Sequence, residues 1–566
     1  MNRDTERQKL FTRRMAMLAG GKALLLSALV GRLYYLQVVE SENYRTLAEE
    51  NRINLRLLPP PRGRIVDRHG RPLAVNSQNY RVVVIAEQSK NVEATLDALG
   101  RIIDISDNDR RRVLREVGRK RKFVPVPVRG NLDWESVAQI EVNAPDLPGI
   151  AIDEGQSRFY PYGEDLAHVL GYVAPAAERE LTGDPLLELP GFRIGKGGVE
   201  RIYDLALRGT GGKSEVEVNA VGRVIRELSR NEGEPGADIT LTIDLDLQRL
   251  ATRRLEGQSG AAVVLDVDTG DVLALVSTPG YDPNAFNRGL SSQEWHSLVS
   301  NPRAPLTNKA VAGQYAPGST FKMVVALAAL EKGAITPELT VNCWGRTRLG
   351  TADFHCWKRG GHGPVDLYDA LTQSCDTYFY EVARRIGIDR IAAMAHRLGL
   401  GQVLGLDLPG ERPGLLPNRD WKLATVGVPW QMGETLIAGI GQGYVLSTPL
   451  QLAVMTARIA NGGRGVVPRL VRRSPSSSGG GAPPAADLGI PQAHLRIIQE
   501  GMVGVVDDRR GTARGAAIKE PGFEMAGKTG TSQVRRISKA EREAGVIKNE
   551  DLPWERRDHA LFVGYA

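Results

Sequence analysis

Three things are scarce in this 566-residue sequence: cysteine, aromatic side chains and net charge. Three cysteines are too few for a disulfide-stabilised scaffold. Aromatic residues make up 6% of the chain, and the net charge of +7 comes without a block of Lys and Arg interleaved with aromatic residues, which argues against nucleic-acid binding. The remaining composition, 42% hydrophobic and 25% charged, is that of a globular protein long enough for several domains.

The N-terminus carries a long apolar run, Met15 to Val39, in which 18 of 25 residues are hydrophobic. At about 1.5 Å per residue, such a run can cross a bilayer. Five Lys or Arg residues precede it, which favours a cytoplasmic tip at 1–14 and an uncleaved signal anchor at 15–39, with the rest of the chain outside the cytoplasm. Because Lys22 and Arg32 lie inside the run, an amphipathic helix on the membrane surface is an alternative, as is a cleaved signal peptide.

Beyond the anchor, the composition changes at residue 236. Residues 40–235 mix short strand-like runs, such as 80–86, with charged helical stretches, such as 107–122. They contain no cluster of catalytic residue types. The pattern therefore predicts a mixed α/β module with a structural or partner-binding role.

Residues 236–566 begin and end with strand-like runs and have helical segments between them. The strand-like runs are 260–279, 525–534 and 560–565, and the helical segments are 318–333 and 365–399. Because strands from the two ends of a domain pair with each other across the intervening helices, this order predicts an α+β fold with a central antiparallel sheet flanked by helices. Residues 474–486, rich in Ser, Gly and Pro, are expected to be a mobile surface loop.

The second part contains the only Ser-x-x-Lys tetrapeptide of the chain, Ser319 to Lys322, at the start of a predicted helix. Residues i and i+3 share a helix face, so the Lys322 amine can reach the Ser319 hydroxyl. A desolvated lysine beside another cation is neutral enough to act as the base that a serine nucleophile needs. On its own, the tetrapeptide is weak evidence.

The only Lys-Thr-Gly occurs in a strand-like run, as Lys528, Thr529, Gly530 and Thr531. Residues 528 and 530 face the same side of a strand, and a glycine lets a ligand lie close to the backbone. The cation of Lys528 and the hydroxyl of Thr531 suit a substrate carboxylate. A strand lysine beside a turn is the simpler alternative.

Between these two motifs stands Ser374-Cys375-Asp376. A literal Ser-Asp-Asn occurs at residues 106–108, but it precedes the candidate nucleophile in a charged stretch and is interpreted as a helix cap or turn. Ser374 has the right order and spacing to complete a three-motif site, with Asp376 at a position where Asn is more usual.

The order and spacing of these motifs resemble those of class B penicillin-binding proteins, and the resemblance covers nearly the whole chain. Further segments that look like this family are PPPRGRIVDRHGRPLA (59–74), YPYGEDLAHVLGYV (160–173), GVERIYDLALRGTGG (198–212), APGSTFK (316–322), GQGYVLSTPLQLA (441–453) and AGKTGT (526–531). The resemblance implies a D,D-transpeptidase that cross-links peptidoglycan stem peptides, releases D-Ala and is acylated by β-lactams.

The family mechanism carries over to matching positions. The resemblance implies that Ser319 attacks the carbonyl of the penultimate D-Ala, with Lys322 as general base. Ser374 would shuttle the proton to the leaving amine, and Asp376 and Lys528 would complete the polar network.

The same resemblance assigns the substrate contacts. Thr529 and Thr531 would flank the substrate carboxylate, with Gly530 between them. The backbone N–H groups of Ser319 and Thr531 would form the oxyanion hole. An amine from a neighbouring stem peptide would then resolve the acyl-enzyme.

All three cysteines lie close together in the sequence. Cys343, Cys356, His362 and Cys375 offer three thiolates and one imidazole, a donor set typical of tetrahedral zinc. A Cys343–Cys356 disulfide with a free Cys375 is the alternative outside the cytoplasm. Elongation-type members of the resembled family have a zinc site beside the active site, with ligands in segments corresponding to HCWKRGGHG and SCD, which favours structural zinc and favours His362 over His355.

Asp376 also favours the elongation type of transpeptidase, because the division type usually has Asn there. The division-specific transpeptidase and a non-enzymatic β-lactam sensor or scaffold are the alternatives, and the intact motif residues argue against the second. The family normally continues beyond residue 566 with a further strand and helix, so that end of the domain is expected to be missing from this sequence.

The resemblance also implies that residues 40–235 form an elongated, mixed α/β pedestal or dimerisation module. It further implies partners and a compartment. No glycosyltransferase domain precedes the pedestal, so a SEDS-family polymerase (RodA) would make the lipid-linked nascent strands, with MreC as scaffold. The protein would be a single-pass inner-membrane protein with its catalytic domain in the periplasm.

Overall fold

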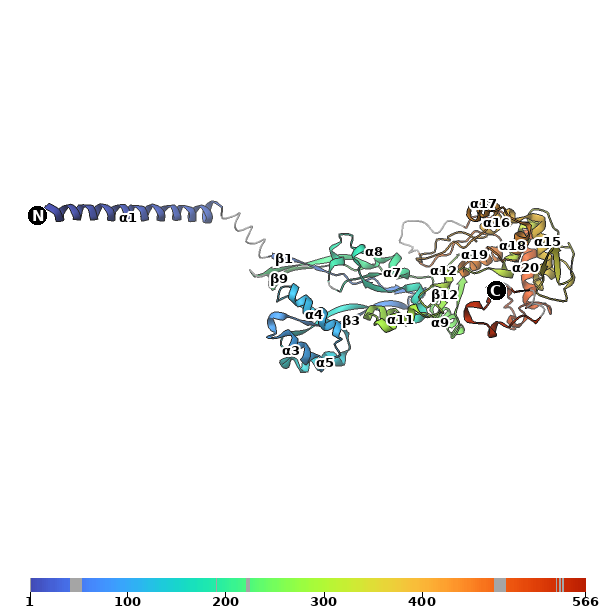
Figure 1. The fold of residues 1–566 in the computed structure, drawn as a ribbon, viewed down its shortest axis with the longest axis horizontal. Helices are drawn as coiled ribbons and strands as arrows, with labels where there is room; N and C mark the ends of the chain where they lie inside the picture. The colour runs from blue at the N-terminus through green and yellow to red at the C-terminus, as the bar shows by residue number, and fades with distance from the viewer. Residues whose placement is uncertain are drawn as a thin grey trace.

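Figure 1 shows the computed structural model, which describes residues 2–40, 53–189, 191–219, 224–472, 485–535, 537–538, 541 and 544–566. The strands of the pedestal and the helix-rich C-terminal module follow one another along the long axis of the molecule. Residues 474–484, most of the segment expected to be a mobile loop, lie outside the described residues.

The chain begins with a long helix, α1 (Asn2–Tyr34), which ends in a π turn, η1 (Tyr35–Val39). The span Phe11–Val39 is long and apolar enough to cross a membrane, and none of it is buried against the rest of the protein. The predicted apolar N-terminal helix is therefore confirmed. Its orientation in a membrane stays a prediction.

The pedestal is built on one long strand, β3 (Pro72–Val84). β2, β4 and β5 pair with β3 in antiparallel fashion, and β10 pairs with β2 in parallel. These strands span Ile65–Val66 (β2), Val126–Leu132 (β4), Ile150–Phe159 (β5) and Ile239–Thr240 (β10). Three helices lie beside this sheet in Figure 1, α3 (Val92–Leu99), α4 (Asp107–Arg119) and α5 (Trp134–Val142). Buried side chains such as Val82, Leu96 and Val113 form a core between helices and sheet.

A second sheet, on the side of the pedestal that faces α1 in Figure 1, contains three antiparallel strands in the order β1-β8-β9. They span Ile53–Leu58 (β1), Thr210–Val218 (β8) and Val224–Glu234 (β9). Short elements complete the pedestal: η4 (Gly163–Leu166), α6 (Ala167–Leu170), β6 (Val173–Pro175), β7 (Arg193–Gly195), α7 (Gly198–Ile202) and α8 (Asp204–Arg208).

Two antiparallel strand pairs form the centre of the C-terminal module. One is β11 (Gly260–Leu265) with β12 (Val272–Thr278), and the other is β17 (Ala526–Ser532) with β18 (His559–Tyr565). Helix α19 (Pro449–Ala460) packs against both β11 and β18 and so connects the two pairs. The α+β fold and the strands expected near the two ends of the module are confirmed.

Helix α13 (Lys322–Glu331) lies at the heart of this module, and every residue from Lys322 to Leu330 is buried. A helix that is apolar on all sides belongs in a core. It packs on α15, α16 and α20.

The other helices are α9 (Leu245–Arg254), α10 (Pro283–Arg288), α11 (Ser292–Val299), α12 (Lys309–Ala312), α14 (Leu367–Thr372), α15 (Asp376–Ile386), α16 (Ile388–Arg397), α17 (Arg419–Val426), α18 (Met432–Gly439) and α20 (Gln492–Asp507). Four short strands form two further hairpin-like pairs: β13 (Val341–Cys343) with β16 (Gly363–Val365), and β14 (Arg346–Leu349) with β15 (Ala352–His355).

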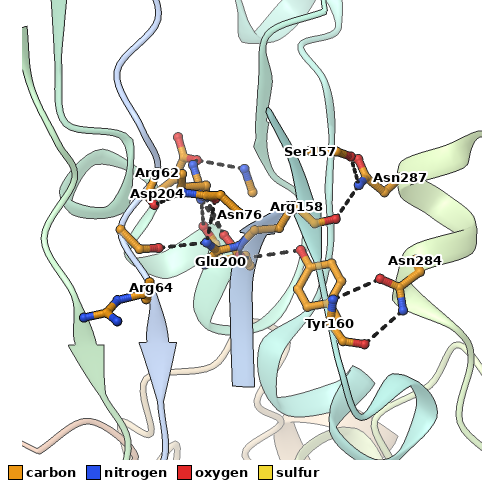
Figure 2. Close-up of polar contacts among 12 residues, drawn as sticks. Arg62, Arg64, Asn76, Ser157, Arg158, Tyr160, Glu200, Asp204, Asn284 and Asn287 are labelled. Carbon is orange, nitrogen blue, oxygen red and sulfur yellow. Dashed lines mark hydrogen bonds and ion pairs between the residues drawn. The ribbon is translucent and has the colours of Figure 1, made fainter. Parts of the chain in front are cut away.

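A buried carboxylate, Glu200 in α7, joins separate parts of the pedestal (Figure 2). Its two oxygens accept hydrogen bonds from Arg62 Nε at 2.7 Å and from Arg158 Nε at 2.6 Å. Arg62 also pairs with Asp204 at 2.9 Å. The segment before β2, the end of β5 and the two short helices are thereby held at one charge centre.

The C-terminal module attaches to the same strand. In α10, Asn287 donates to Ser157 Oγ at 2.6 Å and to the carbonyl oxygen of Arg158. Asn284 exchanges two hydrogen bonds with the backbone of Tyr160, at 2.9 and 3.0 Å. The strand that positions Arg158 for Glu200 is therefore also the strand that α10 binds.

We expect Glu200→Ala to lower the free energy of unfolding by about 3 kcal/mol or more, because it leaves Arg158 and Arg62 without their buried partner. Asp238→Asn is the matched control, since the Arg64–Asp238 pair is largely exposed and is expected to contribute about 1 kcal/mol or less. Thermal and urea unfolding of the purified protein measure both. Equal loss in the two variants would contradict a central role for Glu200.

Candidate active site

The candidate nucleophile Ser319 is half-buried in a 3₁₀ turn, η7 (Gly318–Phe321), directly before α13. Gly318 has φ +54°, and a Cβ added there would lie 2.4 Å from the carbonyl oxygen of Thr531 in β17. On the other side, Gly318 N–H donates to the carbonyl oxygen of Gly441 at 2.8 Å. The turn is thus fixed between β17 and the loop at 441 by backbone contacts that leave no room for a side chain.

Lys322, at the start of α13, is completely buried. Its Nζ donates to Asp376 Oδ1 at 2.7 Å, to the Ser374 carbonyl oxygen at 2.8 Å and to Ser374 Oγ at 3.2 Å. Among the described residues, no hydrogen bond joins Lys322 Nζ to Ser319 Oγ, although the two residues are three positions apart. The amine instead connects the first motif to the second.

Lys528, on strand β17, contacts the same hydroxyl: its Nζ lies 2.9 Å from Ser374 Oγ. Burial holds the pKa of Lys528 well below its usual range, the nearby charge of Lys322 lowers this pKa further, and Asp376 acts in the opposite direction. Ser374 Oγ therefore lies between two buried amines, of which one has a strong tendency to be neutral. Such an arrangement can relay a proton. The buried position of the Lys528 amine differs from the expectation that it offers a cation to a substrate carboxylate.

Strand β17 places its residues on alternate sides. Lys528, Gly530 and Ser532 are buried, whereas Thr529 is half-buried and Thr531 is exposed. A Cβ at position 530 would lie 3.0 Å from both the Pro317 carbonyl oxygen and the Thr320 methyl carbon. Gly530 was expected to make room for a ligand; its nearest neighbours are instead the residues around the Ser319 turn.

The second motif has unusual backbone geometry. Ser374, between α14 and α15, has φ +55°, a left-handed conformation that is rare for a residue other than glycine. Asp376 begins α15, and its Oδ2 accepts a hydrogen bond from Trp357 N–H at 2.9 Å. Trp357 belongs to no catalytic motif, and its only sequence signal is that it follows Cys356. The Ser106 triplet takes no part in this site, since Ser106 caps α4 by accepting from Asp109 N–H at 3.1 Å.

A cleft of about 460 Å³ adjoins this site. Tyr315 and Gln442 line it together with the residues that follow β17 and with His559 of β18. Gln442 donates to the Thr531 carbonyl oxygen at 2.7 Å, so the wall of the cleft is hydrogen-bonded to β17. An extended peptide that enters the cleft would reach the end of the strand that carries Thr531.

Directly beside Ser374, one donor atom from each of Cys343, Cys356, His362 and Cys375 lies within 4.8 Å of the others. The His362 Nδ1 is 3.5 Å from Cys343 Sγ and 3.6 Å from Cys356 Sγ. All three cysteines are free and buried, so the alternative Cys343–Cys356 disulfide is not formed in this structure. His355 is exposed on β15 and does not belong to the cluster.

The chemistry of this donor set suits a divalent cation. The Cys375 thiol donates a hydrogen bond that stabilises the Cys356 thiolate, which lowers the pKa of Cys356. The same hydrogen bond, burial and the charge of Cys356 raise the pKa of Cys375. A tetrahedral zinc ion with Zn–S of about 2.3 Å and Zn–N of about 2.0 Å separates its ligand atoms by roughly 3.5–3.8 Å. The histidine–sulfur distances fit this geometry.

Comparison with known proteins agrees with this arrangement of motifs. Residues 260–566 match the penicillin-binding protein transpeptidase domain, and residues 57–241 match the penicillin-binding protein dimerisation domain. The chain belongs to the penicillin-binding protein transpeptidase family. It is 39% identical over 577 residues to peptidoglycan D,D-transpeptidase MrdA of Escherichia coli strain K12, a match that covers 99% of this chain and 90% of that relative.

Solved structures of the family have the same fold. Penicillin-binding protein PBP2 of Helicobacter pylori, in complex with MreC, superposes with a TM-score of 0.78 at 28% identity, covering 91% of this chain and 92% of that one. A structure of a peptidoglycan synthase complex that coordinates polymerisation and crosslinking matches with a TM-score of 0.65 at 32% identity, covering 92% of this chain and 89% of that one.

We expect Gly318→Ala to lower the rate of acylation by a fluorescent penicillin by about tenfold or more, because a side chain at φ +54° that meets Thr531 displaces the neighbouring Ser319. Gly515→Ala is the control, since a Cβ there has nothing within 4 Å. Time courses of labelling give both rates. Wild-type labelling by the Gly318 variant would contradict the role of this contact.

Proposed function

We propose that this protein is the elongation-type peptidoglycan D,D-transpeptidase of its cell and that Ser319 is the residue acylated. The observation that carries the proposal is the buried relay, in which Ser374 Oγ lies 3.2 Å from Lys322 Nζ and 2.9 Å from Lys528 Nζ. The similarity of this chain to MrdA, which covers 99% of the chain, supports the transpeptidase activity. Asp376 in the second motif supports the elongation type.

In the proposed reaction, Ser319 Oγ attacks the carbonyl carbon of the penultimate D-Ala and its proton passes to the buried amines. Backbone N–H groups of Ser319 and Thr531 would hold the developing oxyanion. Ser374 returns the proton to the departing nitrogen, so that D-Ala leaves as a neutral amine and an ester remains on Ser319. The amine of a neighbouring stem peptide then attacks the ester, which forms the cross-link and restores the serine hydroxyl.

The strand β17 would bind the substrate next to this relay. Thr529 and Thr531 would hydrogen-bond the terminal carboxylate, and Thr531 is exposed as that role requires. A β-lactam carries an equivalent carboxylate and a strained acyl group, so the same contacts would direct it to Ser319.

We also propose that the protein is anchored in the inner membrane. The α1 helix would be a single-pass anchor in the inner membrane, with residues 1–14 cytoplasmic and the catalytic module periplasmic, since positive residues precede the apolar span. An MreC scaffold and the SEDS polymerase RodA would be its partners in handling lipid-linked strands. The MreC complex of the Helicobacter pylori relative and the peptidoglycan synthase complex support this assignment.

A structural zinc ion at Cys343, Cys356, His362 and Cys375 is the second part of the proposal. The ion would join β13, the segment after β15 and the Ser374 motif, which no disulfide links. It would contribute stability to the region beside the relay, because structural zinc supplies folding free energy.

We expect Ser319→Ala to abolish covalent labelling by a fluorescent penicillin, because no other serine occupies the nucleophile position. Ser106→Ala, in the literal Ser-Asp-Asn of the pedestal, is expected to label like the wild type, since Ser106 only caps a helix. Gel fluorescence and the mass of the adduct measure labelling. Covalent labelling of the Ser319→Ala variant would contradict the assignment of Ser319 as the nucleophile.

We expect the purified protein to contain one zinc ion per chain and to expose three thiols only after chelation and unfolding. His362→Ala is expected to lose most of the zinc, and His355→Ala to retain it, because only His362 faces the sulfur atoms. Elemental analysis and thiol titration give the result. Three reactive thiols without zinc, or one thiol with a disulfide, would rule out the site.

A further inference from the structure

Trp357 lies where the cysteine loop meets the second motif. Its backbone N–H donates to Asp376 Oδ2 at 2.9 Å. Its indole N–H donates to the carbonyl oxygens of Gln373 and Ser374, each at 3.1 Å. One residue therefore holds both the backbone and the carboxylate of the motif that binds Lys322.

The groups that Trp357 contacts are the same groups that orient Lys322. The Ser374 carbonyl oxygen accepts from both the indole and Lys322 Nζ, at 3.1 and 2.8 Å. The two oxygens of Asp376 are divided between Lys322 Nζ and Trp357 N–H. Displacing Trp357 therefore releases two of the three acceptors that fix the lysine.

The backbone of Ser374 needs such support. With φ +55° it has a conformation that costs about 1 kcal/mol or more for a residue with a side chain, and such a conformation persists only where its surroundings hold it. The indole N–H holds the carbonyl groups of Gln373 and Ser374, which lie on either side of that dihedral. The position of Ser374 Oγ between the two amines depends on the same dihedral.

Hydrophobic packing does not account for Trp357. Its side chain is 59% exposed, and the polar edge of the ring, not its apolar face, is directed at the motif. Trp344 makes the contrast clear: it likewise follows a cysteine of the cluster, it is 76% exposed, and it makes no hydrogen bond within the described part of the chain.

We propose that Trp357 is a positioning residue for acyl transfer: its indole N–H holds the Ser374 carbonyl so that Ser374 Oγ stays between Lys322 and Lys528. The inference rests on the proposed function, because it assigns to this hydrogen bond an effect on acylation of Ser319. It predicts an effect on the rate of the chemical step and none on the binding that precedes it.

The test compares Trp357→Phe and Trp344→Phe in the full-length protein. Phenylalanine in place of Trp357 keeps the backbone bond to Asp376 and removes the indole N–H together with part of the ring. Stopped-flow acylation by a fluorescent penicillin over a range of concentrations separates the dissociation constant from the maximal acylation rate. We expect the maximal rate of Trp357→Phe to fall about five- to tenfold, the equivalent of one hydrogen bond, with an unchanged dissociation constant. Trp344→Phe should match the wild type.

A second variant removes the N–H without altering shape. Replacing Trp357 by 3-benzothienylalanine puts sulfur in place of the indole nitrogen, and it should lower the maximal rate as much as phenylalanine does, at an unchanged melting temperature and unchanged metal and thiol content. A wild-type maximal rate in this variant, or a change confined to the dissociation constant, overturns the inference while leaving the proposed function intact. A wild-type protein that is not acylated on Ser319 overturns the proposed function itself.

Discussion

The catalytic module depends on burying two lysine amines beside one carboxylate. Lys322 and Lys528 are both without solvent exposure; Asp376 forms an ion pair with Lys322, and its charge also acts on Lys528, where it raises the pKa against the effect of burial. A buried ammonium is costly unless it is paired and hydrogen-bonded, so two buried amines beside a single carboxylate favour the loss of a proton from one of them. Burial therefore lowers the pKa of Lys528, the amine without the ion pair, and Ser374 Oγ is the hydroxyl that both amines contact.

Because the two amines lie against the same hydroxyl, the segments that carry them must approach each other closely. Lys322 begins a helix and Lys528 lies on a strand some two hundred residues later, so their amines meet at Ser374 only if the Ser319 turn and β17 are in backbone contact. Gly318 and Gly530 permit that contact, since a Cβ at either position would overlap or crowd the other segment. The same glycines that bring the lysines together also place Ser319 beside the exposed Thr531.

The sequence predicts the local features of the site, but not the contacts between residues that are distant in the sequence. Ser319 and Lys322, the strand of Lys528 and the cap at Ser106 follow from spacing and residue type, and the family resemblance orders them. That Lys322 binds Ser374 and Asp376 rather than Ser319 depends on the fold, which brings together residues more than fifty positions apart. The partners of Glu200 in the pedestal are equally distant in the sequence, and no short pattern marks them.

The cysteine cluster and the relay are adjacent in the covalent chain, and this adjacency links the loop after β15 to the second motif. Cys375 is a direct neighbour of both Ser374 and Asp376, and Cys356 directly precedes Trp357, which donates to both of them. Cys375 thus reaches the relay through one peptide bond, and Cys356 reaches it through the hydrogen bonds of Trp357. A metal ion that fixes Cys356 relative to Cys375 would therefore also fix the indole relative to the carbonyl it binds, and would limit the movement of Ser374 without touching any reacting atom.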